Sequence, residues 1–96
     1  FILITTGKDG MHYYRRGGPA AGQHFPVHVQ EVIDVTGAGD TVVAVAASCL
    51  ANRLAHDHMC RLCNLAAGYV VGHFGATTIS LAQLNQLEIR SKNEVL

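Results

Sequence analysis

The chain has 96 residues, of which 49% are hydrophobic and 15% are charged, and its formal net charge is zero. This composition indicates a core-forming chain, either one small domain or part of a larger one, and it argues against a disordered tail. Zero net charge removes the usual electrostatic basis for binding nucleic acid or an anionic membrane surface.

Three cysteines, an odd number, without a secretion-signal pattern at the start, indicate reduced thiols and a cytoplasmic protein. The longest stretch of low polarity, residues 41–51, is about half the roughly 20 residues that a membrane-spanning helix needs, so no membrane partner is expected. The chain opens with Phe1 in a strand-like run and without an initiator methionine, which favours a fragment of a longer polypeptide whose N-terminal part is missing.

The first predicted elements form a hairpin. FILITT, residues 1–6, is an apolar run of the kind that makes a strand buried on both faces. GKDG, residues 7–10, interrupts this run, and MHYYRR, residues 11–16, alternates enough to be the partner strand. A flexible connection over residues 17–23 follows.

Residues 24–35 then predict one or two short strands, with Pro26 at an edge or at a strand start. The pattern changes to helices after this point. TVVAVAASCLANRLA, residues 41–55, is alanine-rich, long for a strand and apolar nearly all round, which favours a buried helix that begins near Ala38.

Residues 56–74 predict a second helix, whose apolar stripe consists of Met59, Leu62, Cys63, Ala66, Ala67 and Val70. Ser80 is a candidate N-cap for a last amphipathic helix, and the apolar residues of that helix are Leu81, Leu84 and Leu87. Strands followed by helices indicate an α/β fold.

The stretch DVTGAGDT, residues 34–41, lies at the start of the first predicted helix. Gly37 and Gly39 permit positive φ, so that successive N–H groups can form an anion-binding nest at the positive end of the helix dipole. Asp40 in the first turn has two interpretations: an acid that stabilises the helix start, or a general base beside a transferring phosphoryl group.

DVTGAGDT resembles the signature of the ribokinase-like (PfkB) family of carbohydrate kinases. Two further segments resemble the family in the right order: TTGKDG, residues 5–10, and NLAAGYVVGHFGATTIS, residues 64–80. The whole chain, residues 1–96, is therefore interpreted as the C-terminal, nucleotide-binding part of a ribokinase-like α/β fold. Within the family, the closing stretch is most similar to the heptose-7-phosphate kinase domain of ADP-heptose synthesis.

The resemblance implies a role for each matching residue. Asp40 matches the catalytic base that deprotonates the sugar hydroxyl, and the anion hole that steadies the γ-phosphoryl group matches Gly37, Ala38 and Gly39. The hairpin beside ATP matches residues 5–10, with the candidate contacts Thr5, Thr6, Gly7, Lys8 and Gly10. Asn64 matches a position near the adenine.

Two metal ions are implied in the same way. Mg²⁺ would arrive with ATP. A monovalent cation such as K⁺ would lie near Asp34, Thr36 and the backbone carbonyls of Val70, His73 and Gly75, although Asp34 is equally explained as a structural turn cap.

Other patterns have alternative interpretations. His56, His58, Cys60 and Cys63 are all possible zinc ligands, but only three of them share a helical face and the chain has no second cysteine pair. Cys63 also lies on the apolar stripe, where a free cysteine acts as a small core residue. Residues 13–16, YYRR, suggest a stacking surface for nucleic acid, which the neutral net charge disfavours.

The sequence therefore predicts part of an ATP-dependent kinase that phosphorylates a hydroxyl of a sugar or sugar phosphate, with a heptose 7-phosphate as the preferred substrate. The sugar-binding residues of the family lie mostly in the missing N-terminal part, so the chain is expected to be inactive alone. The alternative is a non-catalytic nucleotide-binding or assembly fragment that retains the fold. The sequence leaves homo-oligomerisation open.

Overall fold

A computed structural model of the chain describes residues 1–26, 36–72 and 78–94. Three short strands, β1 (Ile2–Thr5), β2 (Met11–Tyr14) and β3 (Gln23–Phe25), form an antiparallel sheet in the order β1-β2-β3. Three helices follow, α1 (Ala38–Ala51), α2 (His56–Val71) and α3 (Leu81–Glu94). The α/β prediction is confirmed.

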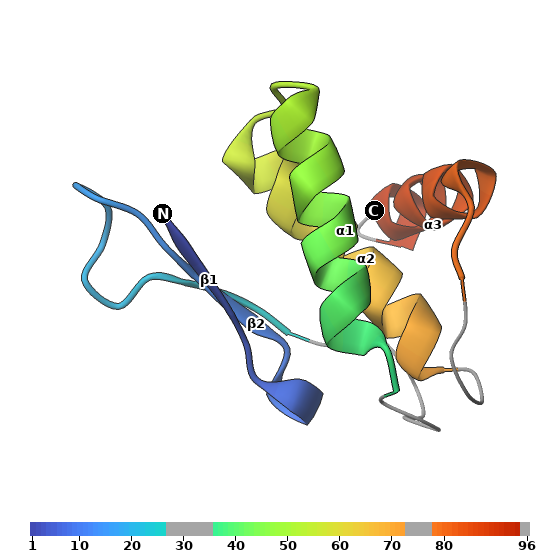
Figure 1. Cartoon of the computed structure of the whole chain (residues 1–96), viewed down its shortest axis with the longest axis horizontal. Helices are drawn as coiled ribbons and strands as arrows, with labels where there is room; N and C mark the ends of the chain where they lie inside the picture. Colours follow the sequence, from blue (N-terminus) through green and yellow to red (C-terminus); the bar gives the residue numbers. More distant parts are fainter. Residues whose placement is uncertain (27–35, 73–77, 95–96) are drawn as a thin grey trace.

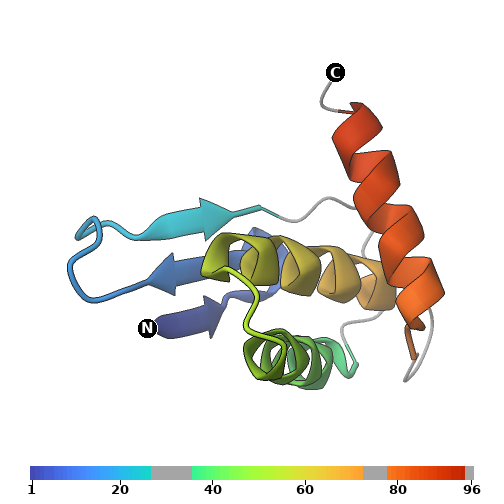
Figure 2. The same ribbon diagram turned by 90° about the horizontal axis from the view of Figure 1, so that it is seen from above.

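Helix α2 lies at the centre of the molecule, where it packs on the sheet, along α1 on one flank, and against α3 near its C-terminal end (Figures 1 and 2). Its buried face largely matches the predicted stripe, since Met59, Cys63, Ala66 and Val70 are fully buried and Leu62 is nearly so. Ala67 is only partly buried, and Cys60, which the predicted stripe did not include, is fully buried. Met11, Tyr13 and Phe25 from the sheet complete the core against this face.

The predicted hairpin is confirmed, and a short 3-10 turn, η1 (Gly7–Asp9), connects its strands. The prediction that the first strand is buried on both faces is wrong for the described residues, since Ile2 and Ile4 are 61% and 45% exposed. These two side chains pair across the strands with Tyr14 and His12, on the face of the sheet that α2 does not cover.

The first predicted helix is confirmed, but it is not buried all round. Val42 and Cys49 are buried, whereas Val43 is 68% exposed and Leu50 is 43% exposed. The helix also ends earlier than predicted, at Ala51, because Arg53 takes a positive φ of 57° in the turn to α2.

A reciprocal capping box begins α3 and confirms Ser80 as its N-cap. The Ser80 hydroxyl accepts the N–H of Gln83 at 3.1 Å, and the Gln83 side-chain oxygen accepts the N–H of Ser80 at 2.8 Å. Of the three predicted apolar residues, Leu84 is buried but Leu81 is 75% exposed. None of the helices in the described parts of the chain is long and apolar enough to cross a membrane.

The three thiols are free and buried where α1 meets α2. Burial, with a smaller contribution from the charges of neighbouring groups, raises the pKa of Cys60 to about 11 and that of Cys63 to about 12, from an ordinary value of 9.0. Such thiols are poor nucleophiles at neutral pH, so a thioredoxin-type role for this Cys-x-x-Cys pair is not supported.

These raised pKa values predict alkaline destabilisation. Between about pH 9 and pH 12 the folded chain retains thiol protons that the unfolded chain loses, so the stability present below pH 9 declines as pH rises. We expect the urea midpoint to fall between about pH 8 and about pH 10.5, and to fall less in Cys63→Ala. An equal decline in both proteins would contradict this assignment.

Candidate active site

The start of α1 forms the predicted glycine turn. Gly37 is the N-cap, with a left-handed φ of 80°, and no side chain caps the helix there. The N–H groups of Ala38, Gly39 and Asp40 therefore lie in the first turn, where a helix has no backbone acceptors of its own. Donors of this kind, at the positive end of the helix dipole, suit an anion.

The sequence suggested positive φ angles at both glycines of this turn. Gly37 has one, but Gly39 is helical and does not. A Cβ atom added to Gly37 or to Gly39 would meet no atom within 4 Å. Both glycines therefore face open space, and an incoming group can approach the backbone closely at this point.

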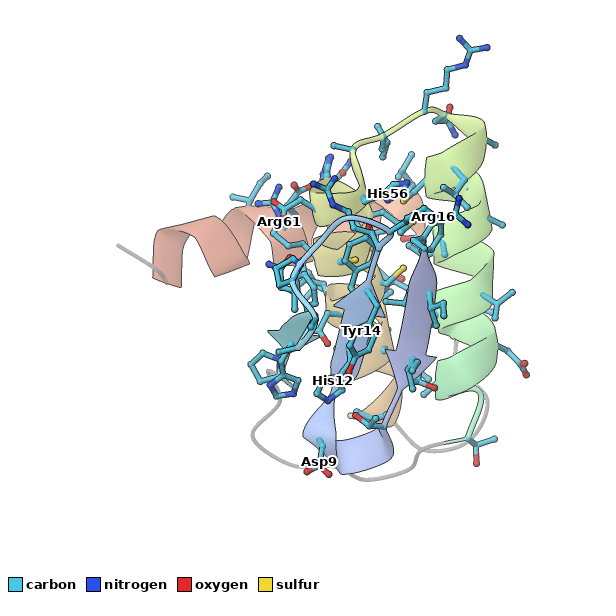
Figure 3. The ribbon with its side chains drawn as sticks, turned by 90° about the vertical axis from the view of Figure 1, so that its left-hand side faces the viewer. Asp9, His12, Tyr14, Arg16, His56 and Arg61 are labelled. Atoms are coloured by element: carbon cyan, nitrogen blue, oxygen red, sulfur yellow. The ribbon has the colours of Figure 1, made fainter. Side chains whose placement is uncertain are left out.

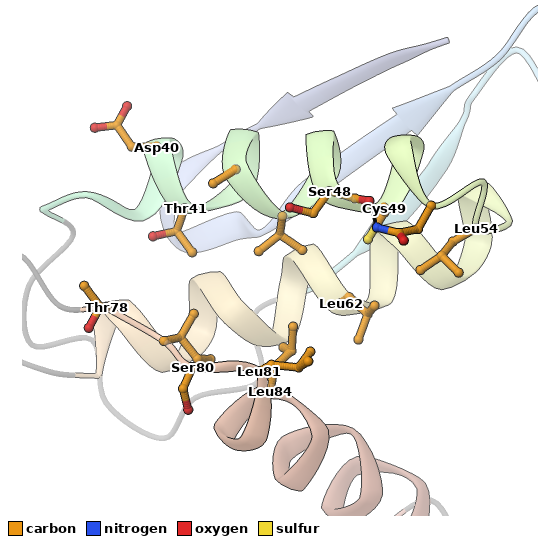
Figure 4. Close-up of a pocket in the computed structure, with 14 residues that line it drawn as sticks. Asp40, Thr41, Ser48, Cys49, Leu54, Leu62, Thr78, Ser80, Leu81 and Leu84 are labelled. Carbon is orange, nitrogen blue, oxygen red and sulfur yellow. Dashed lines mark hydrogen bonds between the residues drawn. The ribbon is translucent and has the colours of Figure 1, made fainter.

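Asp40 is exposed in the first turn of α1, and no described residue forms an ion pair or hydrogen bond with its carboxylate. In Figure 4 the carboxylate projects outward from the helix start. An unpaired, accessible carboxylate next to anion-binding N–H groups has the arrangement that a general base requires.

Thr41 fixes this turn, a role that the sequence interpretation did not assign. Its backbone N–H and its hydroxyl both donate to the carbonyl oxygen of Gly37, each at 2.9 Å. The signal was present in DVTGAGDT, since a threonine four residues after the N-cap can donate back to the carbonyl one turn earlier.

The turn between β1 and β2 lies at the same end of the molecule as the start of α1 (Figure 1). Thr6 closes this turn, because its N–H and its hydroxyl donate to the carbonyl oxygen of Gly10 at 2.8 and 2.9 Å. Gly7 and Gly10 take positive φ angles of 61° and 92°. Thr5 is the last residue of β1, and Lys8 lies within η1.

The C-terminal end of α2 also reaches this end of the molecule (Figure 1). The Val70 side chain is fully buried, and the helix ends one residue later. Thr36 precedes the glycine turn and is exposed. The remaining predicted cation-site residues, Asp34, His73 and Gly75, lie outside the described residues, as does most of the predicted strand region 24–35.

Asn64 is the only polar residue among the buried side chains of the described parts, at 8% exposure. Its amide nitrogen donates to the carbonyl oxygen of Pro26 at 2.7 Å, which ties α2 to the end of β3. Asn64 thus has a structural role in positioning the chain beyond β3.

Asn64→Ala should lower the free energy of unfolding by about 2 kcal/mol, because it leaves a part-buried carbonyl without a donor. Asn52→Ala is the matched control: Asn52 makes the same kind of bond, to the Ser48 carbonyl at 2.8 Å, but at an exposed position where water replaces it. The control should cost less than about 0.5 kcal/mol. Equal costs in urea titrations would contradict the buried role.

A groove of about 780 Å³ lies between α1, α2 and α3, next to the glycine turn (Figure 4). Asp40 and Thr41 lie at one end of it, and Leu54 lies at the other. Its walls are mostly aliphatic, with Val45, Leu62 and Leu84 among them. The groove therefore offers mainly apolar contacts, and the donors that suit an anion at this end are the backbone N–H groups at the start of α1.

The zinc interpretation is wrong for the described residues, in which no group of three or more histidine, cysteine or acidic side chains could hold a metal ion. The ring of His56 bonds to the Tyr13 hydroxyl, and that of His58 pairs with Glu88 at 2.9 Å. Residues 13–16 also do not form one stacking surface, since Tyr13 is buried in the core while Tyr14 lies on the opposite face of the sheet.

Comparison with known proteins supports the sequence resemblance. The bifunctional protein HldE of Aeromonas salmonicida is 45% identical over 83 residues, which are 86% of this chain and 17% of that protein. HldE of Vibrio cholerae serotype O1 is 44% identical over 92 residues, which are 96% of this chain and 19% of that protein. The chain thus spans about a fifth of the length of these relatives.

Solved structures confirm the ribokinase-like fold. Arabidopsis thaliana ribokinase, solved with ribose and ATP, superposes with a TM-score of 0.76 at 26% identity, over 88% of this chain and 28% of the ribokinase. Cryptococcus neoformans ribokinase, solved with ADP, gives a TM-score of 0.72 at 26% identity, over 92% of this chain and 27% of the ribokinase. A family model described as pfkB family carbohydrate kinase matches residues 1–83. The chain belongs to the pfkB family of carbohydrate kinases.

Proposed function

We propose that the protein containing this chain transfers the γ-phosphoryl group of ATP to a hydroxyl of a sugar or sugar phosphate. The observation that carries this proposal is the start of α1, where an exposed, unpaired Asp40 follows a glycine turn whose N–H groups are not capped by a side chain. Family membership and the likeness to ribokinases solved with ATP and with ADP support the same reaction.

Asp40 acts as the base in this proposal. It accepts the proton of the acceptor hydroxyl as the oxygen bonds to the γ-phosphorus, and the bond from that phosphorus to the β-phosphate oxygen breaks. The N–H groups of Ala38 and Gly39, after the left-handed Gly37, donate to the phosphoryl oxygens and stabilise their charge. Positioning and charge stabilisation supply most of such catalysis, so few side chains are needed.

The β1–β2 turn is the proposed nucleotide contact, through Thr5, Thr6, Gly7, Lys8 and Gly10. Its position at the same end of the molecule as the helix start supports this assignment (Figure 1). The adenine would lie near Asn64. The Asn64 side chain donates a hydrogen bond to the Pro26 carbonyl and so fixes the end of β3 next to α2.

The proposed metal ions are a Mg²⁺ that enters with ATP and neutralises its phosphates, and a monovalent cation such as K⁺. The C-terminal end of α2 suits a cation because it is the negative end of the helix dipole, although the Gly72 N–H already points toward the carbonyl oxygens of Gly68, Tyr69 and Val70. The proposed monovalent-cation ligands are Asp34, Thr36, Val70, His73 and Gly75.

We propose D-glycero-D-manno-heptose 7-phosphate as the substrate, which would place the protein in lipopolysaccharide-precursor synthesis. The identity of about 45% to HldE proteins supports this choice over ribose, since identity to the ribokinases is 26%. The proposed location is the cytoplasm, which the three free thiols favour. The sugar site would come mainly from an N-terminal part of the same polypeptide.

A coupled ADP-release assay of the full-length protein tests this function. Turnover with the heptose 7-phosphate at a kcat/KM at least about tenfold above that with ribose would support it. Absence of turnover with every sugar phosphate, together with retained ATP binding in calorimetry, would instead favour the non-catalytic alternative.

A further inference from the structure

The outer face of the sheet, which α2 does not cover, carries His12, labelled in Figure 3, and its strand partner His24. His12 on β2 and His24 on β3 are direct partners in the antiparallel register. Their imidazole rings stack with centroids 4.5 Å apart and planes inclined by 19°. Residues paired across antiparallel strands keep their Cβ atoms about 5 Å apart, so both rings are held on one side of a rigid hairpin.

The hydrogen bonding of His24 determines which of its nitrogens is available. Its Nε2 lies 2.5 Å from the backbone carbonyl oxygen of Asp9, and a carbonyl oxygen only accepts. Nε2 is therefore the protonated nitrogen of the neutral ring, and Nδ1 carries a free lone pair. A ring nitrogen that donates to a backbone carbonyl, while the other remains unprotonated, is the arrangement that metal-bound histidines adopt.

The second ring is also available. Within the described parts of the chain, the His12 imidazole makes no hydrogen bond, and its contact is the stack with His24. His24 is exposed and His12 is half-buried, so water can complete the coordination of an ion bound between them. Rotation of the His12 ring about χ2, a broad torsion in histidine, would turn one of its nitrogens toward Nδ1 of His24, while the His24 ring keeps its hydrogen bond to Asp9.

We propose that His12 and His24 bind one divalent first-row transition ion of the class that prefers imidazole, such as Ni²⁺, Cu²⁺ or Zn²⁺. The two imidazoles supply the protein ligands, and water supplies the others. Mg²⁺ is a hard ion that prefers oxygen ligands, so it does not compete at this site. Neither histidine is among the proposed phosphoryl-transfer residues, and the site does not rest on the proposed catalytic function, although His24 bonds to the Asp9 carbonyl in the proposed nucleotide-contact turn.

Calorimetric titration of the chain with NiCl₂ tests the proposal. His12→Asn and His24→Asn should each raise the dissociation constant for Ni²⁺ at least about tenfold, while MgCl₂ gives no heat at this site. His58→Asn is the matched control, because His58 is a half-exposed histidine committed to Glu88, and it should leave Ni²⁺ affinity unchanged. Unchanged affinity in His12→Asn and His24→Asn would overturn the proposal.

A second measurement does not depend on the variants. Substoichiometric Cu²⁺ added to the unmodified chain should broaden the imidazole NMR signals of His12 and His24 before those of His56 and His58. Broadening that starts at any other histidine would place the strongest site elsewhere and would also overturn the proposal.

Discussion

Asp40→Asn in the full-length protein should lower kcat by about a thousandfold and leave the dissociation constant for ATP within about twofold. The amide cannot take the hydroxyl proton, but the N–H groups of Ala38 and Gly39 remain to hold the phosphates. Steady-state kinetics with the sugar phosphate and calorimetry with ATP and Mg²⁺ measure the two quantities separately.

Asp57→Asn provides the matched control for this variant. Asp57 is also an exposed acid in the first turn of a helix, but of α2, which begins at the opposite end of the molecule. Both substitutions remove a favourable helix-dipole interaction of about 0.3–1 kcal/mol, so a loss of activity specific to Asp40 cannot come from helix stability. Equal activities in the two variants would remove Asp40 from the role of base.

Gly10→Ala should destabilise the chain by at least about 3 kcal/mol. A Cβ atom at this position would lie 2.1 Å from the carbonyl oxygen of Phe25 and 3.0 Å from the Cα of Pro26, both of them backbone atoms. The φ of 92° and ψ of −133° add conformational strain for any residue other than glycine. Unfolding in urea, followed by circular dichroism, measures the loss.

Gly7→Ala in the same turn is the control that separates the cost of the positive φ from the cost of the steric clash. Gly7 has a φ of 61°, but an added Cβ atom would meet nothing within 4 Å. Only the left-handed backbone penalises alanine there, at about 1 kcal/mol. If Gly10→Ala lowered the free energy of unfolding by no more than Gly7→Ala, the backbone of Gly10 would not lie as close to the Phe25 carbonyl as the structure places it.

Local patterns predicted the elements well. The buried face of α2 followed from a helical period that places Met59, Cys63, Ala66 and Val70 on one side, and the N-cap of α3 followed from Ser80. The glycine turn at the start of α1 could be read because Gly37 needs a left-handed φ that other residues rarely adopt.

Contacts between distant residues could not be predicted. The ring of His56 suggested a zinc ligand in the sequence, yet it bonds to Tyr13, which is 43 positions away. The bond from Asn64 to the Pro26 carbonyl spans 38 positions. Such partners are brought together by the packing of α2 on the sheet, which no local pattern specifies.

Burial was the least predictable property. The apolar runs around Ile4 and Val43 correctly predicted a strand and a helix, but both side chains are exposed in the structure. An apolar pattern identifies a face that is able to pack, whereas its burial depends on which other element covers that face. The end of α1 was missed for a related reason, because Arg53 takes its positive φ without a glycine or proline to indicate the turn.

The most direct measurement of the central claim is an NMR titration of the ¹⁵N-labelled chain with ATP and Mg²⁺, which reports on each backbone amide. We predict that the largest shifts occur at the amides of Ala38, Gly39 and Asp40, with smaller ones in the turn of residues 6–10. A cavity of about 480 Å³ near Tyr13, Arg15 and His56 lies at the other end of the sheet. Shifts confined to that cavity, with the amides at the start of α1 unchanged at saturation, would contradict the account.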